Sequence, residues 1–114
     1  MAVKNSLKKS YTQSPEQIME VLRNPRFPQL LDVEMIEEAK LADGIEFRYG
    51  RKTTWQRWGR NYFLKVSQAE GGTVITVTIQ SRKRTVLFDP AWKQEAEKAL
   101  NRLEVLMELL GTEK

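Results

Sequence analysis

The sequence predicts an α+β fold: a two-layer sandwich in which a curved antiparallel sheet carries a short N-terminal helix and a long C-terminal helix on one face. Two observations lead to this prediction. Segments in which apolar and polar residues alternate follow one another from residue 31 to residue 82, and an amphipathic helix pattern lies on each side of them. Strands with one apolar face need a cover, which two helices with one apolar stripe each can provide. We therefore expect the order strand, helix, four strands, helix in a single domain, residues 1–114.

The N-terminal part begins with a short edge strand over residues 6–12, followed by a short helix. The sequence of Ser14–Gln17, SPEQ, is typical of a helix start, because serine accepts from the exposed amides and glutamine completes a capping box. Asn24 and Pro25 should end this helix, since proline cannot continue its hydrogen bonds. Residues 26–30 are expected to form an irregular connection to the sheet.

Alternation of apolar and polar residues defines the remaining strands. Ile36 breaks the first of these patterns, which predicts a bulge or a strand end, and Gly59 is a second candidate bulge. Turns are expected at residues 42–44 and 70–72, and a connection at residues 50–53. The clearest strand is TVITVTIQS, in which period and β propensity agree. The expected strands are residues 31–35, 45–49, 55–66 and 73–81.

The last predicted element is a helix from about Asp89 to Leu110. Asp89 can cap its start, Pro90 suits its first turn, and Gly111 should stop it. At about 1.5 Å per residue this helix is long enough to cross a whole sheet. Its apolar face consists of Trp92, Ala96, Ala99, Leu103, Leu106 and Leu110.

Composition removes several classes of function. The chain has no histidine and no cysteine, which excludes Ser-His and Cys-His catalysis, histidine metal sites and zinc-thiolate sites. It has no glycine-rich phosphate loop either, because Gly71 and Gly72 mark a hairpin turn. We therefore expect no enzymatic activity, no cofactor and no metal. No apolar run reaches the roughly 18 residues of a membrane span, and the N-terminus lacks a signal-peptide pattern, so a cytoplasmic protein is the simplest expectation.

The charge distribution is the strongest indication of function. Net charge is +4, but residues 47–88 contain nine basic side chains and one acidic side chain, Glu70, so the rest of the chain is acidic overall. Such an asymmetry is typical of a surface that attracts an anionic partner. The candidate anion-binding residues are Arg48, Arg51, Lys52, Trp55, Arg57, Arg60, Lys65, Arg82, Lys83 and Arg84.

Two interpretations of these residues stay open. If the outward face of the sheet gathers them, it is a platform for phosphates or stacked bases, with nucleic acid as the first expected partner and an acidic protein or anionic lipid headgroups next. Otherwise the cations keep an uncovered sheet soluble. Trp55 could stack on a ligand or make a cation–π contact. Two further alternatives are a structural module, for example a homodimer, and a pocket for a small apolar ligand under the long helix.

Three sequence stretches carry a resemblance to known domains: TTWQRWGRNYFLKV, TVITVTIQS and FDPAWKQEAEKALNRLEVLMELL. With them, residues 45–110 resemble a group of small bacterial α+β domains of undetermined activity. The resemblance implies the order strand, helix, four strands, helix, similar to one TATA-binding-protein-like half or to a trimmed helix-grip, START-like domain. Relatives are expected to carry an acidic residue where this chain has Arg60. The resemblance implies a fold and no particular activity.

Overall fold

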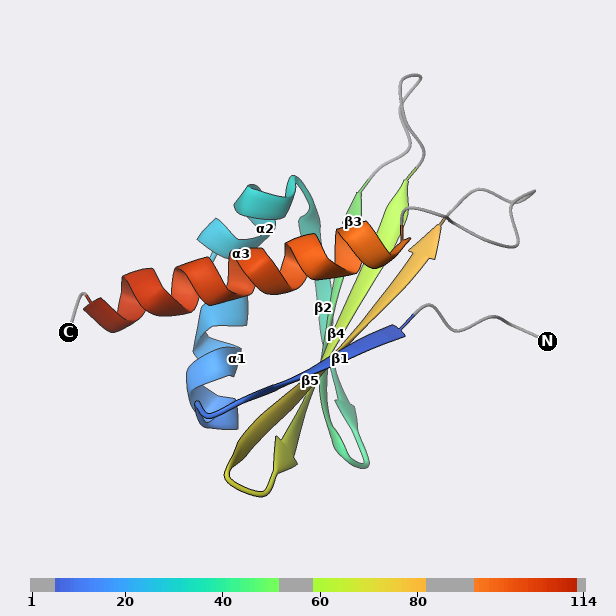
Figure 1. The fold of residues 1–114 in the computed structure, drawn as a ribbon. Coiled ribbons are helices and arrows are strands. Elements are labelled where there is room, and N and C mark those ends of the chain that lie inside the picture. Colours follow the sequence, from blue (N-terminus) through green and yellow to red (C-terminus); the bar gives the residue numbers. More distant parts are fainter. Residues whose placement is uncertain (1–5, 52–58, 82–91, 113–114) are drawn as a thin grey trace.

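The computed structural model describes residues 6–51, 59–81 and 92–112. The strands in this part of the chain form one antiparallel sheet of five strands in the order β1-β5-β4-β3-β2 (Figure 1). The predicted α+β sandwich is therefore confirmed. In chain order the elements are β1 (Ser6–Tyr11), α1 (Pro15–Arg23), α2 (Arg26–Leu31), β2 (Glu34–Leu41), β3 (Gly44–Arg51), β4 (Arg60–Ala69), β5 (Gly72–Ser81) and α3 (Trp92–Thr112).

The helices cover one face of the sheet, which we call the inner face; the other is the open face. Figure 1 shows α3 lying across the sheet, with α1 and α2 on the same side. Alternate residues of β3, β4 and β5 are buried against these helices, as the period of a strand requires. This apolar contact is what stabilises amphipathic helices that would be marginal alone. The core comprises Phe47, Tyr49, Tyr62, Leu64, Val66, Ile75, Val77 and Ile79 from the sheet, and Ile18, Val21, Leu22, Phe27, Leu31, Ala96, Ala99, Leu100, Leu103 and Leu106 from the helices.

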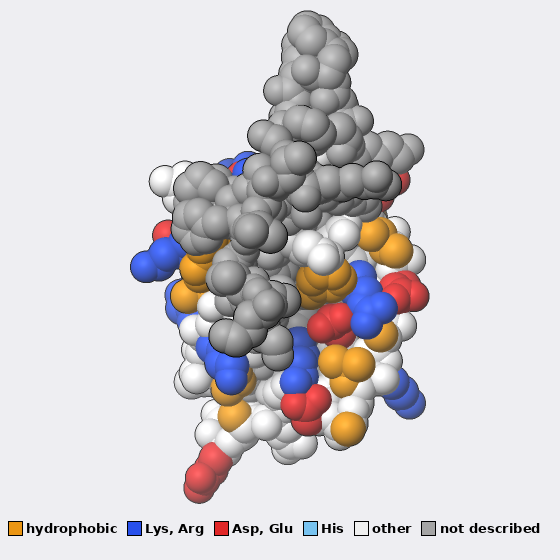
Figure 2. Space-filling model, turned by 90° about the vertical axis from the view of Figure 1, so that its right-hand side faces the viewer, with side chains coloured by type: hydrophobic (Ala, Val, Ile, Leu, Met, Phe, Trp, Pro, Cys, Tyr) orange, Lys and Arg blue, Asp and Glu red, His pale blue; other side chains and the backbone are white. Residues whose placement is uncertain are grey.

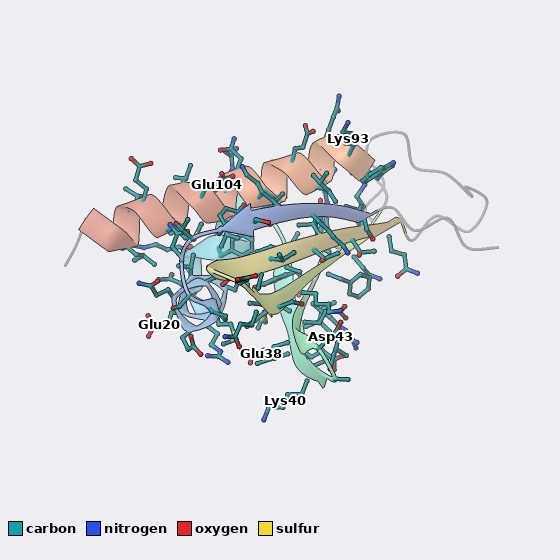
Figure 3. The ribbon with its side chains drawn as sticks, turned by 60° about the horizontal axis from the view of Figure 1, so that its bottom comes forward. Glu20, Glu38, Lys40, Asp43, Lys93 and Glu104 are labelled. Atoms are coloured by element: carbon teal, nitrogen blue, oxygen red, sulfur yellow. The ribbon has the colours of Figure 1, made fainter. Side chains whose placement is uncertain are left out.

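Among the described residues, two ion pairs join the helices to the outer strands of the sheet. Lys9 of β1 contacts Glu104 of α3, with 2.6 Å between Nζ and Oε1. Arg23 of α1 contacts Glu38 of β2 through two hydrogen bonds of 2.8 and 3.1 Å. Glu38 and Glu104 are labelled in Figure 3. Because both pairs are open to solvent, each contributes about 0–1 kcal/mol, so apolar packing dominates the attachment of the helices.

The start of α1 has the predicted capping box. The amide of Gln17 donates to Ser14 Oγ at 3.3 Å, and the amide of Ser14 donates to Gln17 Oε1 at 3.0 Å. The helix ends at Arg23, and Asn24 has an extended backbone, as its position before Pro25 requires. The sequence prediction for both ends of this helix is confirmed.

The irregular connection expected at residues 26–30 is wrong, because Arg26–Leu31 forms the helix α2. Phe27 and Leu31 are one turn apart and both are buried in the core, which gives this short helix its apolar side. Pro28 lies in the first turn, where an amide has no partner within the helix. Asp32 ends the helix in a left-handed conformation, with φ of 56°. Six residues span less than two turns, so helical periodicity could not identify them.

The strands differ from the prediction at their ends. The first expected strand, residues 31–35, is wrong at its start: Leu31 belongs to α2, and β2 begins at Glu34. The bulge predicted at Ile36 is confirmed, since the register with β3 shifts between Met35 and Glu37. The connection expected from residue 50 is also wrong, because β3 continues through Arg51.

Other predictions fall at the limits of the described residues. The described part of β4 begins at Arg60 and pairs in regular register, so Gly59 precedes the strand, while Trp55 and Trp58 lie outside the described residues. The expected helix start, Asp89 and Pro90, also lies outside them. Helix α3 runs through Gly111 to Thr112, so the stop predicted at Gly111 is wrong. None of the described helices combines the length and apolar character needed to cross a membrane.

Candidate anion-binding site

The open face of the sheet carries two of the predicted basic residues, Arg48 of β3 and Lys65 of β4, and both are ion-paired. Arg48 Nε donates to Glu46 Oε1 at 2.7 Å, and its Nη1 contacts Glu37 on the neighbouring strand β2. Lys65 pairs with Asp43 in the β2–β3 turn. The two glutamates raise the pKa of Arg48, and Lys65 holds the pKa of the Asp43 carboxyl below its usual range. Both predicted cations in the described part of this face are thus matched by carboxylates of the same chain.

Figure 2 shows the molecule from the side of this face, where acidic and basic side chains lie next to one another with apolar side chains between them. The aromatic ring of Phe63 lies on the open face, and the Arg48 guanidinium lies over it at 5.9 Å from the centroid. Arg48 therefore makes two ion pairs and one cation–π contact with its own chain. A ligand that used Arg48 would have to replace these contacts.

Arg51 and Arg60 lie elsewhere, on the inner face of the sheet. Arg51 is the last residue of β3, and Arg60 is the first residue of β4. In the strand register, Arg51 lies opposite Arg60, and Arg60 lies opposite Ser81 of β5. We expected Arg51 among the exposed residues of a connection, and this is wrong: Arg51 is only 7% exposed. The reason is the two extra residues of β3, which place Arg51 on the same side as Tyr49.

A polar cluster forms where these strand ends meet the first turn of α3. Arg51 Nη2 donates to the hydroxyl of Tyr62 at 2.5 Å, and this hydroxyl donates to Glu95 Oε2 at 2.7 Å. The same Glu95 oxygen lies 3.5 Å from Arg51 Nη2, and Glu95 Oε1 lies 3.5 Å from Arg60 Nη1. We call Arg51, Arg60, Tyr62 and Glu95 the strand-end cluster.

Burial sets the chemistry of the cluster. Burial of the Tyr62 hydroxyl, aided by its bond to Glu95, raises its pKa to about 12, so the hydroxyl stays neutral and can accept and donate at once. The Arg51 side chain is 8% exposed, and its guanidinium also lies 5.8 Å from the centroid of the Tyr62 ring. Within the described part of the chain, Arg51 Nε is buried without a hydrogen-bond partner. A buried charged group with an unused donor is rare, because the donor loses its bond to water on folding.

The strand-end cluster was only partly predictable. Both arginines are among the anion-binding residues predicted from the sequence, whereas Tyr62 and Glu95 are not. The signal for Glu95 was its place beside Ala96, at the margin of the apolar face of α3. Six candidate residues lie outside the described residues and are placed neither in nor out of the cluster: Lys52, Trp55, Arg57, Arg82, Lys83 and Arg84.

No three or more histidine, cysteine, aspartate or glutamate side chains of residues 6–51, 59–81 and 92–112 gather in a way that could hold a metal ion. The strand-end cluster contributes one carboxylate and two cations to this end of the sheet. The groups that surround this carboxylate are two guanidinium groups and a neutral hydroxyl.

Comparison with known proteins supports the fold and no activity. No family model and no curated protein matches the chain. Among solved structures, Ara h 8.0201 is similar over 96% of this chain and 98% of its own, with a TM-score of 0.61 and 12% identity. A Rhodobacter sphaeroides protein is similar over 96% of this chain and 95% of its own, with a TM-score of 0.53 and 18% identity. The resemblance to small α+β domains is thus supported for the fold, and the more specific TATA-binding-protein-like assignment stays a prediction.

Proposed function

We propose that this protein is a non-catalytic binding domain that takes an anionic group of its partner at the strand-end cluster. The observation that supports this best is the Arg51 guanidinium, which is more than nine-tenths buried and, among the described residues, leaves its Nε without a hydrogen-bond partner. Burying a cation with an unused donor costs stability unless another group compensates it. An anion bound by Arg51 would supply that compensation.

The open face supports such a role less well. Arg48 and Lys65 already have carboxylate partners from their own chain, so an anion bound there would compete with Glu46, Glu37 or Asp43. Polyanion binding across the sheet, which the sequence first suggested, would need these pairs to open. The ends of β3, β4 and β5 are the better location for contact.

Charge in the sequence supports the same end of the sheet. The segments 52–58 and 82–91 join the described strands next to Arg51 and Ser81, and together they contain five of the basic residues predicted to bind anions. A net positive charge near a binding site raises the rate at which an anionic partner arrives. This attraction is long-ranged and weakens with salt, whereas contact at Arg51 would be local.

The proposal can be tested on beads that carry phosphate or carboxylate groups at low salt. We expect Arg60→Gln to weaken retention more than the double change Arg48→Gln with Lys65→Gln, even though the double change removes more charge. Circular dichroism of each variant would establish that it folds. Equal or greater loss of retention in the double variant would move the site to the open face and refute the proposal.

Self-assembly is a second candidate function, and exposed apolar residues favour it. Met35 and Ile36 of the outer strand β2 are 39% and 54% exposed, and Leu30 of the adjacent helix α2 is 42% exposed. A second copy of the chain could cover these side chains in a homodimer. Light scattering over a dilution series would show a dimer that Ile36→Ser dissociates; a monomer at every concentration would remove this candidate.

A pocket for an apolar ligand, the third function expected from a helix-grip fold, has limited support. A hollow of about 380 Å³ lies between β1 and α3, with Leu7 and Leu100 in its wall. The ion-paired Lys9 and Glu104 line it as well, so a purely apolar ligand would meet charge there.

A further inference from the structure

We infer that the strand-end cluster is a carboxylate site that the chain fills with its own Glu95, and that a carboxylate of the partner binds by displacing Glu95. This inference rests on the proposed function and names the chemical class of the ligand. It also makes Glu95 a built-in competitor of that ligand.

The cluster already holds a carboxylate in a defined way. One oxygen of Glu95 accepts from the Tyr62 hydroxyl at 2.7 Å and lies 3.5 Å from Arg51, while the other oxygen lies 3.5 Å from Arg60. The two arginines therefore approach different oxygens of one planar group. This is the arrangement expected of a site for a carboxylate, which has two oxygens to share between cations.

The contacts of Glu95 with the two arginines are longer than strong charge-assisted hydrogen bonds. Charge-assisted hydrogen bonds between a guanidinium and a carboxylate are typically about 2.7–2.9 Å long, so the two contacts at 3.5 Å are loose. Nε and Nη2 form one edge of the guanidinium fork and suit the two oxygens of a carboxylate. On this edge of Arg51, Nη2 donates to the Tyr62 hydroxyl, while Nε has no hydrogen-bond partner among the described residues. A carboxylate on a separate molecule is not tethered to α3, so it can approach this edge of Arg51 more closely than Glu95 does.

Displacement is feasible because of where Glu95 lies. It is in the first turn of α3, and its side chain is 19% exposed, so it can turn toward solvent without moving the helix. The competition is intramolecular, which gives Glu95 a high effective concentration and weakens the apparent affinity of the wild-type protein for an external carboxylate. Removing the charge of Glu95 should therefore strengthen ligand binding.

Two substitutions of equal charge change test this prediction. Glu95→Gln removes the competing charge and keeps an oxygen that can accept from Tyr62. Glu97→Gln removes the same charge two residues further along α3, at an exposed position. Calorimetric titration with succinate at constant ionic strength should give about tenfold tighter binding for Glu95→Gln than for the wild type. The Glu97→Gln control should change affinity by less than about twofold.

The outcomes separate the inference from the proposed function. If the wild type binds succinate and Glu95→Gln binds it no more tightly, the displacement model is wrong while anion binding stands. If Glu95→Gln raises the affinity for inorganic phosphate more than the affinity for succinate, the site binds anions but the carboxylate assignment is wrong. If neither protein binds any probe, the proposed function fails as well. A poly-glutamate peptide in the same titration distinguishes an acidic chain from a small free acid as the ligand. If the ligand is an acidic chain, the affinity for this peptide should rise more with Glu95→Gln than with Glu97→Gln.

A measurement on the wild type covers the case in which Glu95→Gln does not fold. Addition of saturating succinate should increase amide hydrogen exchange in residues 92–96, because the contacts of Glu95 to the sheet are lost. Exchange that stays constant or slows in this turn at saturation would overturn the displacement model.

Discussion

Tyr62→Phe tests whether the strand-end cluster is a connected network. The substitution keeps the buried ring and removes one hydroxyl, which accepts from Arg51 at 2.5 Å and donates to Glu95 at 2.7 Å. Hydrogen bonds to charged groups contribute about 1.5–3 kcal/mol each. Because Arg51 and Glu95 stay within 3.5 Å of each other in the variant, we expect the total loss in the free energy of unfolding to be about 2–3 kcal/mol.

Tyr49→Phe is the matched control. Tyr49 is also fully buried on the inner face, and its hydroxyl donates to the backbone carbonyl of Leu22 at 2.7 Å, a neutral acceptor. We expect this substitution to lower the free energy of unfolding by about 1 kcal/mol. Both values can be measured by urea unfolding followed by tryptophan fluorescence. With a denaturant slope of about 1.5 kcal/mol per molar, the midpoint should fall by about 1.5 M for Tyr62→Phe and about 0.7 M for Tyr49→Phe. Equal shifts, or a larger one for Tyr49→Phe, would refute the idea that Tyr62 connects two charged groups.

Two further predictions concern pH and backbone packing. Burial raises the pKa of Tyr62 from 10.0 to about 12, and it also raises the pKa of Tyr11 and Tyr49, so the folded state holds these protons more tightly than the unfolded state does. This contribution to stability is complete below pH 10 and is lost as the pH rises to about 12, so urea midpoints should fall over that window. If the tyrosinate absorbance of the folded protein rises fully near pH 10, the prediction is contradicted. Gly72→Ala should cost about 2 kcal/mol or more, because a Cβ at this position would lie 2.0 Å from the carbonyl oxygen of Tyr11 in β1. Gly71→Ala is its control, since Gly71 has open space around it and only a φ of 79° to oppose a side chain, so thermal unfolding should show the smaller loss there.

Local signals in the sequence predicted the parts of the fold that depend on neighbouring residues. The capping box at Ser14 and Gln17 acts over three positions, and the alternation of TVITVTIQS sets the two faces of β5. The bulge at Ile36 follows from one break in the pattern of β2. Each of these features is decided by chemistry within one turn or one strand, so a single sequence is enough to predict it.

The strand-end cluster required information that local patterns do not contain. Gly50 suggested the end of a strand, and placing that end two residues early put Arg51 in a connection instead of on the inner face. A shift of one residue in a strand reverses the side to which its side chains point, so errors at strand ends affect sites more than folds. Glu95 is separated from Arg51 by more than forty residues of sequence, and only the packing of α3 on the sheet brings the two together.

The most direct test of the account is the nuclear magnetic resonance signal of the Arg51 Nε–H group during titration with succinate. We predict that this signal shifts with a saturating dependence on succinate, while the Nε–H signal of Arg48, which donates to Glu46, stays in place. An Arg51 signal that does not move under conditions in which Arg48 shifts would contradict binding at the strand-end cluster.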